Sequence, residues 1–181
     1  MEAVISDFGA ILVKLIVPNK DGEKADVVLG FDHLEQYEEN PNFFGSTVGR
    51  SANRIGGAAF QIVTYHLTAN ENENNLHSDF YHGFHKVLWN ADMKDRENAV
   101  VFSYNSPDGE NGFPGNLKIS VTYTLKNDNS LQISYDGISD KKTIINMTNH
   151  SYFNLAGHDA GSICDEKMMI DADAFTELGQ G

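Results

Sequence analysis

The chain is poor in several residue types, and each scarcity excludes a class of protein. Cys164 is the single cysteine among 181 residues, so no intramolecular disulfide can form and nothing indicates an oxidising compartment. The sequence has no run of 18 or more apolar residues and begins without a secretion signal, so we expect a cytoplasmic protein that does not contact membranes. Only 13 Lys and Arg stand against 26 Asp and Glu, and the net charge of −13 argues against nucleic acid as a partner.

The residues that are present indicate an all-β protein. Hydrophobic residues make up 40% of the chain and charged residues 22%, as in ordinary globular domains. The clearest two-residue alternation runs over Leu117–Leu125 and returns at Leu131–Tyr135, which predicts a half-buried antiparallel hairpin. We therefore expect one antiparallel β-sandwich domain over residues 1–181. Further strands are predicted at Gly9–Val17, Val27–Leu29, Phe60–Val63, Tyr65–Leu67, Val87–Met93 and Ala99–Tyr104.

Helix and loop signals are few. Asp32 and Glu35 have the spacing of a capping box, which predicts one short helix over residues 33–39. The segment 48–57 is rich in Gly, Ser and Asn, and Asn70–Asn75 is strongly polar. Both segments are predicted to be loops.

A row of polar side chains stands out in Thr143–Gly157. With the period of a strand, alternate residues of this segment share one face. A buried polar group without a partner costs about 1–3 kcal/mol, so an ordinary core strand would not carry such a row. The pattern alone leaves two interpretations open, which are a solvent-exposed strand face and a face that binds a polyhydroxylated ligand. The row consists of Asn146, Thr148, His150, Tyr152 and Asn154.

The same segment carries a resemblance to a known family. The stretch MTNHSYFNLAG resembles the signature of the aldose 1-epimerases, or galactose mutarotases. Four more stretches resemble family segments in the family's order, so the resemblance covers nearly the whole chain. It implies a large antiparallel β-supersandwich and a cofactor-free isomerase of carbohydrate metabolism, which interconverts the α and β anomers of hexoses such as galactose or glucose. The four stretches are FGAILVKLIVPNKDGEKADVVLGFDHLEQY, VGRSANRIGGAAF, NNLH followed by KVLW, and DGENGFPGNLKISVTYTL.

The resemblance also implies roles for individual residues. Opening a pyranose ring requires a base at the anomeric hydroxyl and an acid at the ring oxygen, and histidine suits the acid because it titrates near pH 7. On the family's pattern His150 is that acid, and His77 is the second residue that we predict to be catalytic. Asn53, Arg54 and His77 fall on positions that contact the sugar, and Tyr152 is predicted to present its ring to it.

Trp89 could present its ring to the sugar in the same way, although an aromatic residue in a strand is more often part of the core. The sequence departs from the family next to His77, where Ser78 and Asp79 replace the usual Gly-Gly. We expect the nearby carboxylate to raise the basicity of His77.

The family's general base is a Glu that lies further along than this chain extends. Glu166 and Glu177 are present, but their settings do not match the base motif. Met168–Ile170 is predicted to begin another strand, continued by 171–176, without a closing element. We therefore expect a β-sandwich truncated at its C-terminus, and a chain that by itself is weakly active or inactive.

Three other interpretations stay open. A non-catalytic carbohydrate-binding module would use the same sugar-facing residues without a base. A metal site would use His77, His82 and His85, although their spacing matches no recognised zinc motif. A purely structural fragment would need its missing half to fold. For the enzyme we expect an aldohexose as the small-molecule partner, no metal or other cofactor, and a monomer or weak homodimer.

Overall fold

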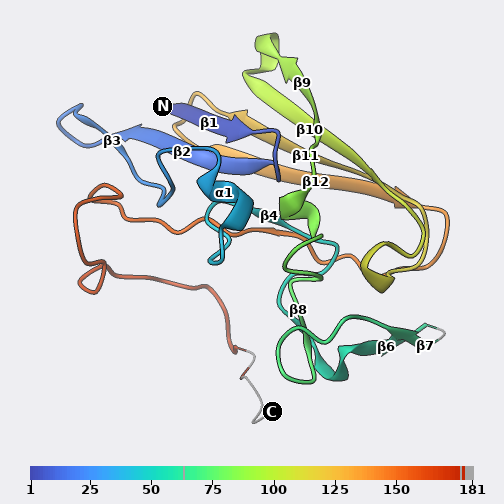
Figure 1. The fold of residues 1–181 in the computed structure, drawn as a ribbon. Helices are drawn as coiled ribbons and strands as arrows, with labels where there is room; N and C mark the ends of the chain where they lie inside the picture. The colour runs from blue at the N-terminus through green and yellow to red at the C-terminus, as the bar shows by residue number, and fades with distance from the viewer. Residues whose placement is uncertain (63, 176, 178–181) are drawn as a thin grey trace.

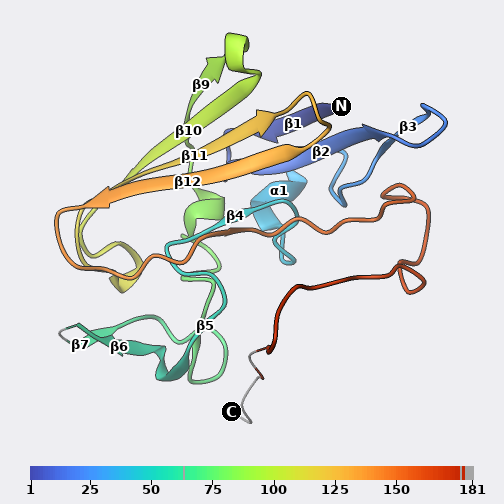
Figure 2. The ribbon, with the colours of Figure 1, turned by 180° about the vertical axis from the view of Figure 1, so that it is seen from behind.

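Two antiparallel sheets pack face to face in the computed structural model, which describes residues 1–62, 64–175 and 177 (Figure 1). One sheet has the strand order β1-β2-β3 and the other has the order β12-β11-β10-β9, seen from its outer side in Figure 2. The predicted all-β sandwich is thus confirmed. The strands are β1 (Glu2–Ser6), β2 (Ile11–Pro18), β3 (Lys24–Asp26), β9 (Asn90–Lys94), β10 (Ala99–Ser106), β11 (Leu117–Leu125) and β12 (Leu131–Ser139).

The core between the sheets follows the alternation of β11. The side chains of Leu117, Ile119, Val121 and Tyr123 are at most 4% exposed and pack against residues of both sheets. β11 pairs with β12 along its whole length, as the predicted hairpin requires, and with β10 over Leu117–Thr124. Burying one such aliphatic side chain stabilises the fold by about 1.5–3 kcal/mol, so this central strand anchors the sandwich.

Short elements lie below the two sheets (Figure 1). Three two-stranded pairs join β13 to β4, β5 to β8, and β6 to β7. Of the residues that were predicted to bind a sugar, Arg54 lies in β5, while Asn53 directly precedes β5 and His77 directly follows β8. The bounds of these strands are β4 (Thr47–Val48), β5 (Arg54–Ile55), β6 (Ala59–Gln61), β7 (Thr64–His66), β8 (Asn75–Leu76) and β13 (Thr148–Asn149), with 3-10 turns η1 (Gly56–Ala58), η2 (Phe84–Lys86) and η4 (Glu110–Gly112). A further 3-10 turn, η3 (Asp95–Glu97), joins β9 to β10.

The predicted helix is shorter than expected. Helix α1 (Gln36–Glu39) has four residues, and the expected capping box does not form because Glu35 occupies the N-cap position without a side-chain cap bond. The C-terminal end of α1 is instead held from outside, because Lys86 donates hydrogen bonds to the carbonyls of Tyr37, Glu38 and Glu39. A cation at this end also complements the helix dipole.

The second strand of the hairpin near the N-terminus is β3 (Lys24–Asp26), which precedes the predicted Val27–Leu29. β2 pairs with β3, whereas Val27–Leu29 lies beyond β3 and contributes an isolated bridge from Val28 to Phe153. The predicted strand pair 60–63 and 65–67 corresponds to β6 and β7, and Val63 lies outside the described residues. β1, which no pattern indicated, adds an edge strand next to β2.

The polar segment Thr143–Gly157 is not one continuous strand. Only β13 is regular, where Asn149 pairs with Thr47, and a separate bridge joins Asn146 to Ser51. The segment crosses several short partners in turn, so no single ladder can form. Met168–Ile170 and 171–175 form no strand, which corrects the prediction of a further strand, and Thr176 lies outside the described residues.

Within the part of the chain that the structure describes, no helix is both long and apolar enough to cross a bilayer.

Candidate active site

A cluster of aromatic rings brings together residues that are far apart in the sequence. The rings of His77 and His150 lie 5.2 Å apart, measured between centroids, and are almost perpendicular at 89°. The ring of Phe43 contacts both of them, at 4.9 Å from His77 and 5.7 Å from His150. The ring of Tyr152 lies 5.2 Å from that of His150. The two histidines predicted to be catalytic are therefore neighbours, and both contact the buried ring of Phe43.

The position of His150 follows from the pairing of β13 with β4. Its backbone N–H donates to the carbonyl of Ser46 over 2.8 Å, directly after the paired residue Asn149. The side chain of Asn149 turns towards the core, where Nδ2 donates to the carbonyl of Gly45 over 2.9 Å. Alternation along the strand then directs His150 to the opposite face.

One ring nitrogen of His77 has a fixed role. The backbone N–H of Asn53 donates to His77 Nδ1 over 3.0 Å, and the N–H of His77 donates back to the carbonyl of Asn53 over the same distance. Because Nδ1 accepts, the neutral ring carries its proton on Nε2. The pKa of His77 is lowered to about 4, mainly by burial and to a smaller extent by the charges of His150 and Arg54, while Glu71 opposes them. At neutral pH His77 is thus an uncharged donor.

The expected effect of Asp79 on His77 is wrong. The carboxylate of Asp79 instead accepts hydrogen bonds from the backbone N–H groups of Tyr81 and His82 at 2.8 Å each. The acidic residue that raises the pKa of His77 is Glu71, from the segment Asn70–Asn75, which the sequence marked only as a polar loop.

The loop that carries Ser78 has left-handed backbone geometry. His77 has φ of 55° and Ser78 has φ of 67°, values that favour glycine. The strain at Ser78 is offset by its fully buried hydroxyl, which accepts from the N–H of Ser51 at 2.8 Å and donates to its carbonyl at 3.1 Å. This pair of bonds ties the His77 loop to the segment that precedes Asn53.

Arg54, the first residue of β5, and Asn53, which precedes it, lie beside His77. Arg54 pairs with Leu76 in the β5–β8 ladder, one residue before His77. Its guanidinium forms a bidentate ion pair with Glu71, with Nε at 2.5 Å and Nη2 at 2.6 Å from the two carboxylate oxygens. Its third nitrogen, Nη1, lies 3.4 Å from Asn53 Oδ1. Asn53, Arg54, His77 and His150 thus form a connected group.

Arg50 holds the Asn53 segment in place, which sequence reasoning missed. It is 1% exposed and donates to the carbonyls of Pro114 at 2.8 Å and Gly115 at 2.9 Å. Its Nε and Nη2 also donate to Ser106 Oγ, at 2.9 and 2.6 Å. Burial lowers the pKa of Arg50, and the nearby carboxylate of Glu110 opposes this. The arginine therefore fastens the segment to the ends of β10 and β11.

The three histidines of the possible metal site do not come together. His85 is 1% exposed and its ring lies 4.6 Å from that of Phe43, whereas the side chain of His82 is 77% exposed beside Asp79. Within 1–62, 64–175 and 177, no group of three or more His, Cys, Asp or Glu is arranged to hold a metal ion.

The remaining predicted residues differ in their exposure. Tyr152 is 43% exposed and packs edge-on against Phe44 at 5.4 Å. Trp89 is 3% exposed, and its Nε1 donates to a backbone carbonyl in the core, so it cannot present its ring to a sugar. Both candidate carboxylates are exposed, and Glu166 accepts a hydrogen bond from the N–H of Leu155.

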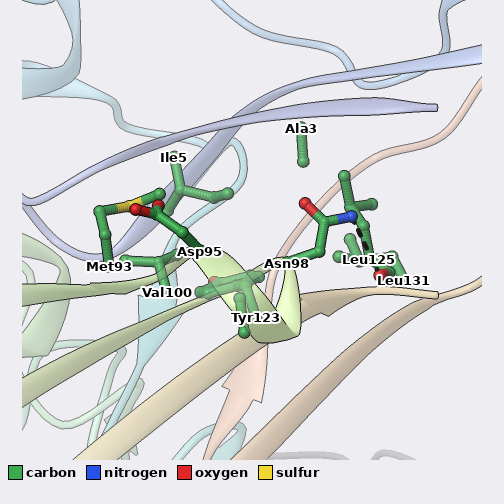
Figure 3. A pocket seen from close by; sticks show the side chains of 10 residues that line it. Ala3, Ile5, Met93, Asp95, Asn98, Val100, Tyr123, Leu125 and Leu131 are labelled. Atoms are coloured by element: carbon green, nitrogen blue, oxygen red, sulfur yellow. Dashed lines mark hydrogen bonds between the residues drawn. The ribbon is translucent and has the colours of Figure 1, made fainter.

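Two neighbouring cavities open elsewhere, between β1 and the four-stranded sheet. The smaller has a volume of about 180 Å³, and Figure 3 shows its lining, in which Asn98 donates to the carbonyl of Leu125. The larger, of about 620 Å³, is lined mainly by apolar side chains of β1, β9 and β10. Neither contains a histidine. Since histidine is the side chain whose ordinary pKa suits proton exchange near pH 7, we assign the candidate site to the histidine cluster.

Comparison with known proteins agrees with the resemblance seen in the sequence. The family model described as Aldose 1-epimerase matches residues 1–181. Galactose mutarotase from Rattus norvegicus is 44% identical over 97% of this chain, and Aldose 1-epimerase from Escherichia coli K12 is 36% identical over 100% of it. These matches cover 51% and 52% of the two relatives, so the chain spans about half their length.

Solved structures give the same result. A GalM/aldose epimerase homologue from C. elegans superposes with a TM-score of 0.78 at 36% identity, covering 84% of this chain and 47% of that one. Galactose 1-epimerase from Lactobacillus acidophilus NCFM gives a TM-score of 0.71 at 33% identity, over 82% and 44% of the two chains. From the match over its whole length and these structural likenesses, the chain belongs to the aldose 1-epimerase family.

Proposed function

We propose that this chain carries the acid half of the active site of an aldose 1-epimerase, which opens and recloses the pyranose ring of a neutral aldohexose. The observation that supports the proposal best is the contact between His77 and His150, whose rings lie 5.2 Å apart although they come from distant segments. His77 is held neutral with its proton on Nε2, so it places an uncharged donor beside the residue that we propose as the acid of ring opening.

His150 is the proposed catalytic acid and donates a proton to the ring oxygen. His77 donates a hydrogen bond from Nε2 to the sugar, since its Nδ1 is occupied by the N–H of Asn53. Arg54 and Asn53 supply donors and acceptors for the hydroxyls, and Tyr152 offers a ring face to the apolar side of the sugar. As the acid gives its proton, a base must take one from the anomeric hydroxyl.

The proposal assigns the role of the base to no carboxylate of the described residues. Glu166 and Glu177 are exposed, and the carboxylate of Glu71 is engaged by Arg54. This favours one alternative, in which the chain binds an aldose without catalysing its mutarotation. We expect weak or no catalysis by the 181 residues, and catalysis in a protein of the relatives' full length that includes them.

Polarimetry tests the proposal. Freshly dissolved α-D-galactose should reach its equilibrium rotation faster in the presence of a protein of the relatives' length that includes this chain, and His150→Asn in it should lower kcat by about 100-fold or more, the scale of one lost acid–base group. His33→Asn is the matched control, since His33 is exposed and distant in the sequence.

Unchanged turnover in His150→Asn would refute the role of the acid. Binding of galactose by the 181-residue chain without faster mutarotation would support the binding module for the isolated chain. Near-normal turnover by that chain would show that one of its own carboxylates is the base.

A further inference from the structure

Arg54 is already fully engaged on one side by Glu71. The two guanidinium nitrogens Nε and Nη2 face the two carboxylate oxygens at 2.5 and 2.6 Å. A bidentate pair of this kind fixes the plane of the guanidinium as well as its position. The nitrogen outside the pair is Nη1, which lies beside Asn53 Oδ1 at 3.4 Å. One edge of Arg54 is thus closed and the other faces the candidate site.

The carboxylate is held in place by a tight turn. The backbone groups of Glu71 and Asn74 bond to each other in both directions, at 3.2 and 2.9 Å. The side chain of Asn74 accepts from the N–H of Gly57 over 3.1 Å, which ties the turn to the end of β5. Glu71 therefore approaches Arg54 from a braced loop, and the ion pair does not depend on two free side chains meeting.

The pair also determines the charge next to the sugar-binding group. The single positive charge of Arg54 is matched by the negative charge of Glu71, and His77 is neutral at pH 7 because its pKa is about 4. An uncharged sugar requires only hydrogen bonds from such a surface. A sugar carboxylate would seek the guanidinium edge that Glu71 already occupies.

We propose that Glu71 is a positioning and specificity residue, which orients Arg54 towards a neutral aldose and denies its charged edge to anionic sugars. The inference deepens the proposed function and rests on it. It assigns the choice between neutral and acidic sugars to a residue that makes no contact with the sugar itself.

The test compares the binding of D-galactose and D-galacturonate to the purified chain. We expect Glu71→Gln to bind galactose about two- to fivefold more weakly and galacturonate about two- to fivefold more tightly, as for one partly exposed ion pair. Glu73→Gln is the matched control, because Glu73 is an exposed residue of the same loop and the change removes the same charge. Glu71→Asp, which keeps the charge, should restore the preference for galactose in part.

The possible outcomes distinguish a failure of the proposed function from a failure of the role proposed for Glu71. If the folded wild-type chain binds neither sugar, the proposed function and the inference both fail. If it binds galactose and Glu71→Gln leaves the ratio of the two affinities unchanged, only the inference fails. An equal loss of both sugars would indicate a purely structural role and would likewise overturn it, and so would the same change of ratio in Glu73→Gln.

Discussion

Acidification should destabilise the protein through one buried histidine. His85 is 1% exposed, its Nε2 donates to the carbonyl of Phe80 at 3.1 Å, and its Nδ1 meets no partner among the described residues. The backbone of Gly83 packs closely against this nitrogen, since a Cβ at residue 83 would lie 2.8 Å from Nδ1. Burial lowers the pKa of His85 to about 4, and its bond to Phe80 opposes this only in part.

The direction of the change in the free energy of unfolding depends on which state binds the proton. Between about pH 6.5 and 4 the unfolded chain binds a proton at residue 85 that the folded chain does not bind, so the free energy of unfolding falls as the pH falls. Integration from pH 7 to pH 5 gives a loss of about 2 kcal/mol from His85. His77 acts in the same direction, but less strongly because it is more exposed. Carboxylates with lowered pKa lose their contribution only at lower pH.

Urea unfolding at pH 7 and pH 5 measures this loss. His85→Gln keeps a donor for the carbonyl of Phe80 but cannot titrate, so it should be less stable than wild type at pH 7 and lose about 2 kcal/mol less on acidification. His82→Gln, at an exposed site, should behave as wild type does. If His85→Gln and wild type lose the same free energy between the two pH values, the reasoning from burial is refuted.

Three further predictions concern stability, each measured by urea unfolding. Arg50→Lys should lower the free energy of unfolding by about 3–5 kcal/mol, because a lysine cannot replace the forked donors of a buried guanidinium. Arg96→Lys, at an exposed turn, should change it by no more than about 0.5 kcal/mol. Equal effects of the two substitutions would contradict the prediction. Ser78→Ala should lower the free energy of unfolding by about 1–3 kcal/mol by removing both bonds to Ser51, and Ser78→Gly should lower it less because it relieves the left-handed backbone. Gly45→Ala should prevent folding, because its Cβ would lie 2.1 Å from a carbonyl oxygen at φ of 64°, while Gly56→Ala meets nothing within 4 Å and should be tolerated.

The sequence predicted the fold where contacts are local and periodic. The hairpin of β11 and β12 appears as expected because the alternation of Leu117–Leu125 matches one buried and one open face. The pattern failed for Met168–Ile170, where three apolar side chains are 71% to 94% exposed. A strand needs a partner as well as apolar residues, and no described strand pairs with this segment.

The candidate site was predictable only in part. The family motif identified His150 and His77, whose positions the structure brings together, and their chemical roles stay predictions. Phe43, Arg50 and Glu71 carried no signal because each acts through residues that are distant in the sequence or irregular in structure. Arg50, for example, depends on carbonyls at Pro114 and Gly115. No periodic pattern encodes such a contact.

The junction of β4 and β13 has a consequence for the order of folding. Asn149 reaches Gly45 across 104 positions of sequence, so closing this contact carries the entropy cost of a long loop. The hairpins of β9 to β12 need only neighbouring residues and can form first. The imidazole of His150 therefore meets that of His77 late, once most of this chain has left the ribosome, and substitutions at the junction should speed unfolding more than they slow folding.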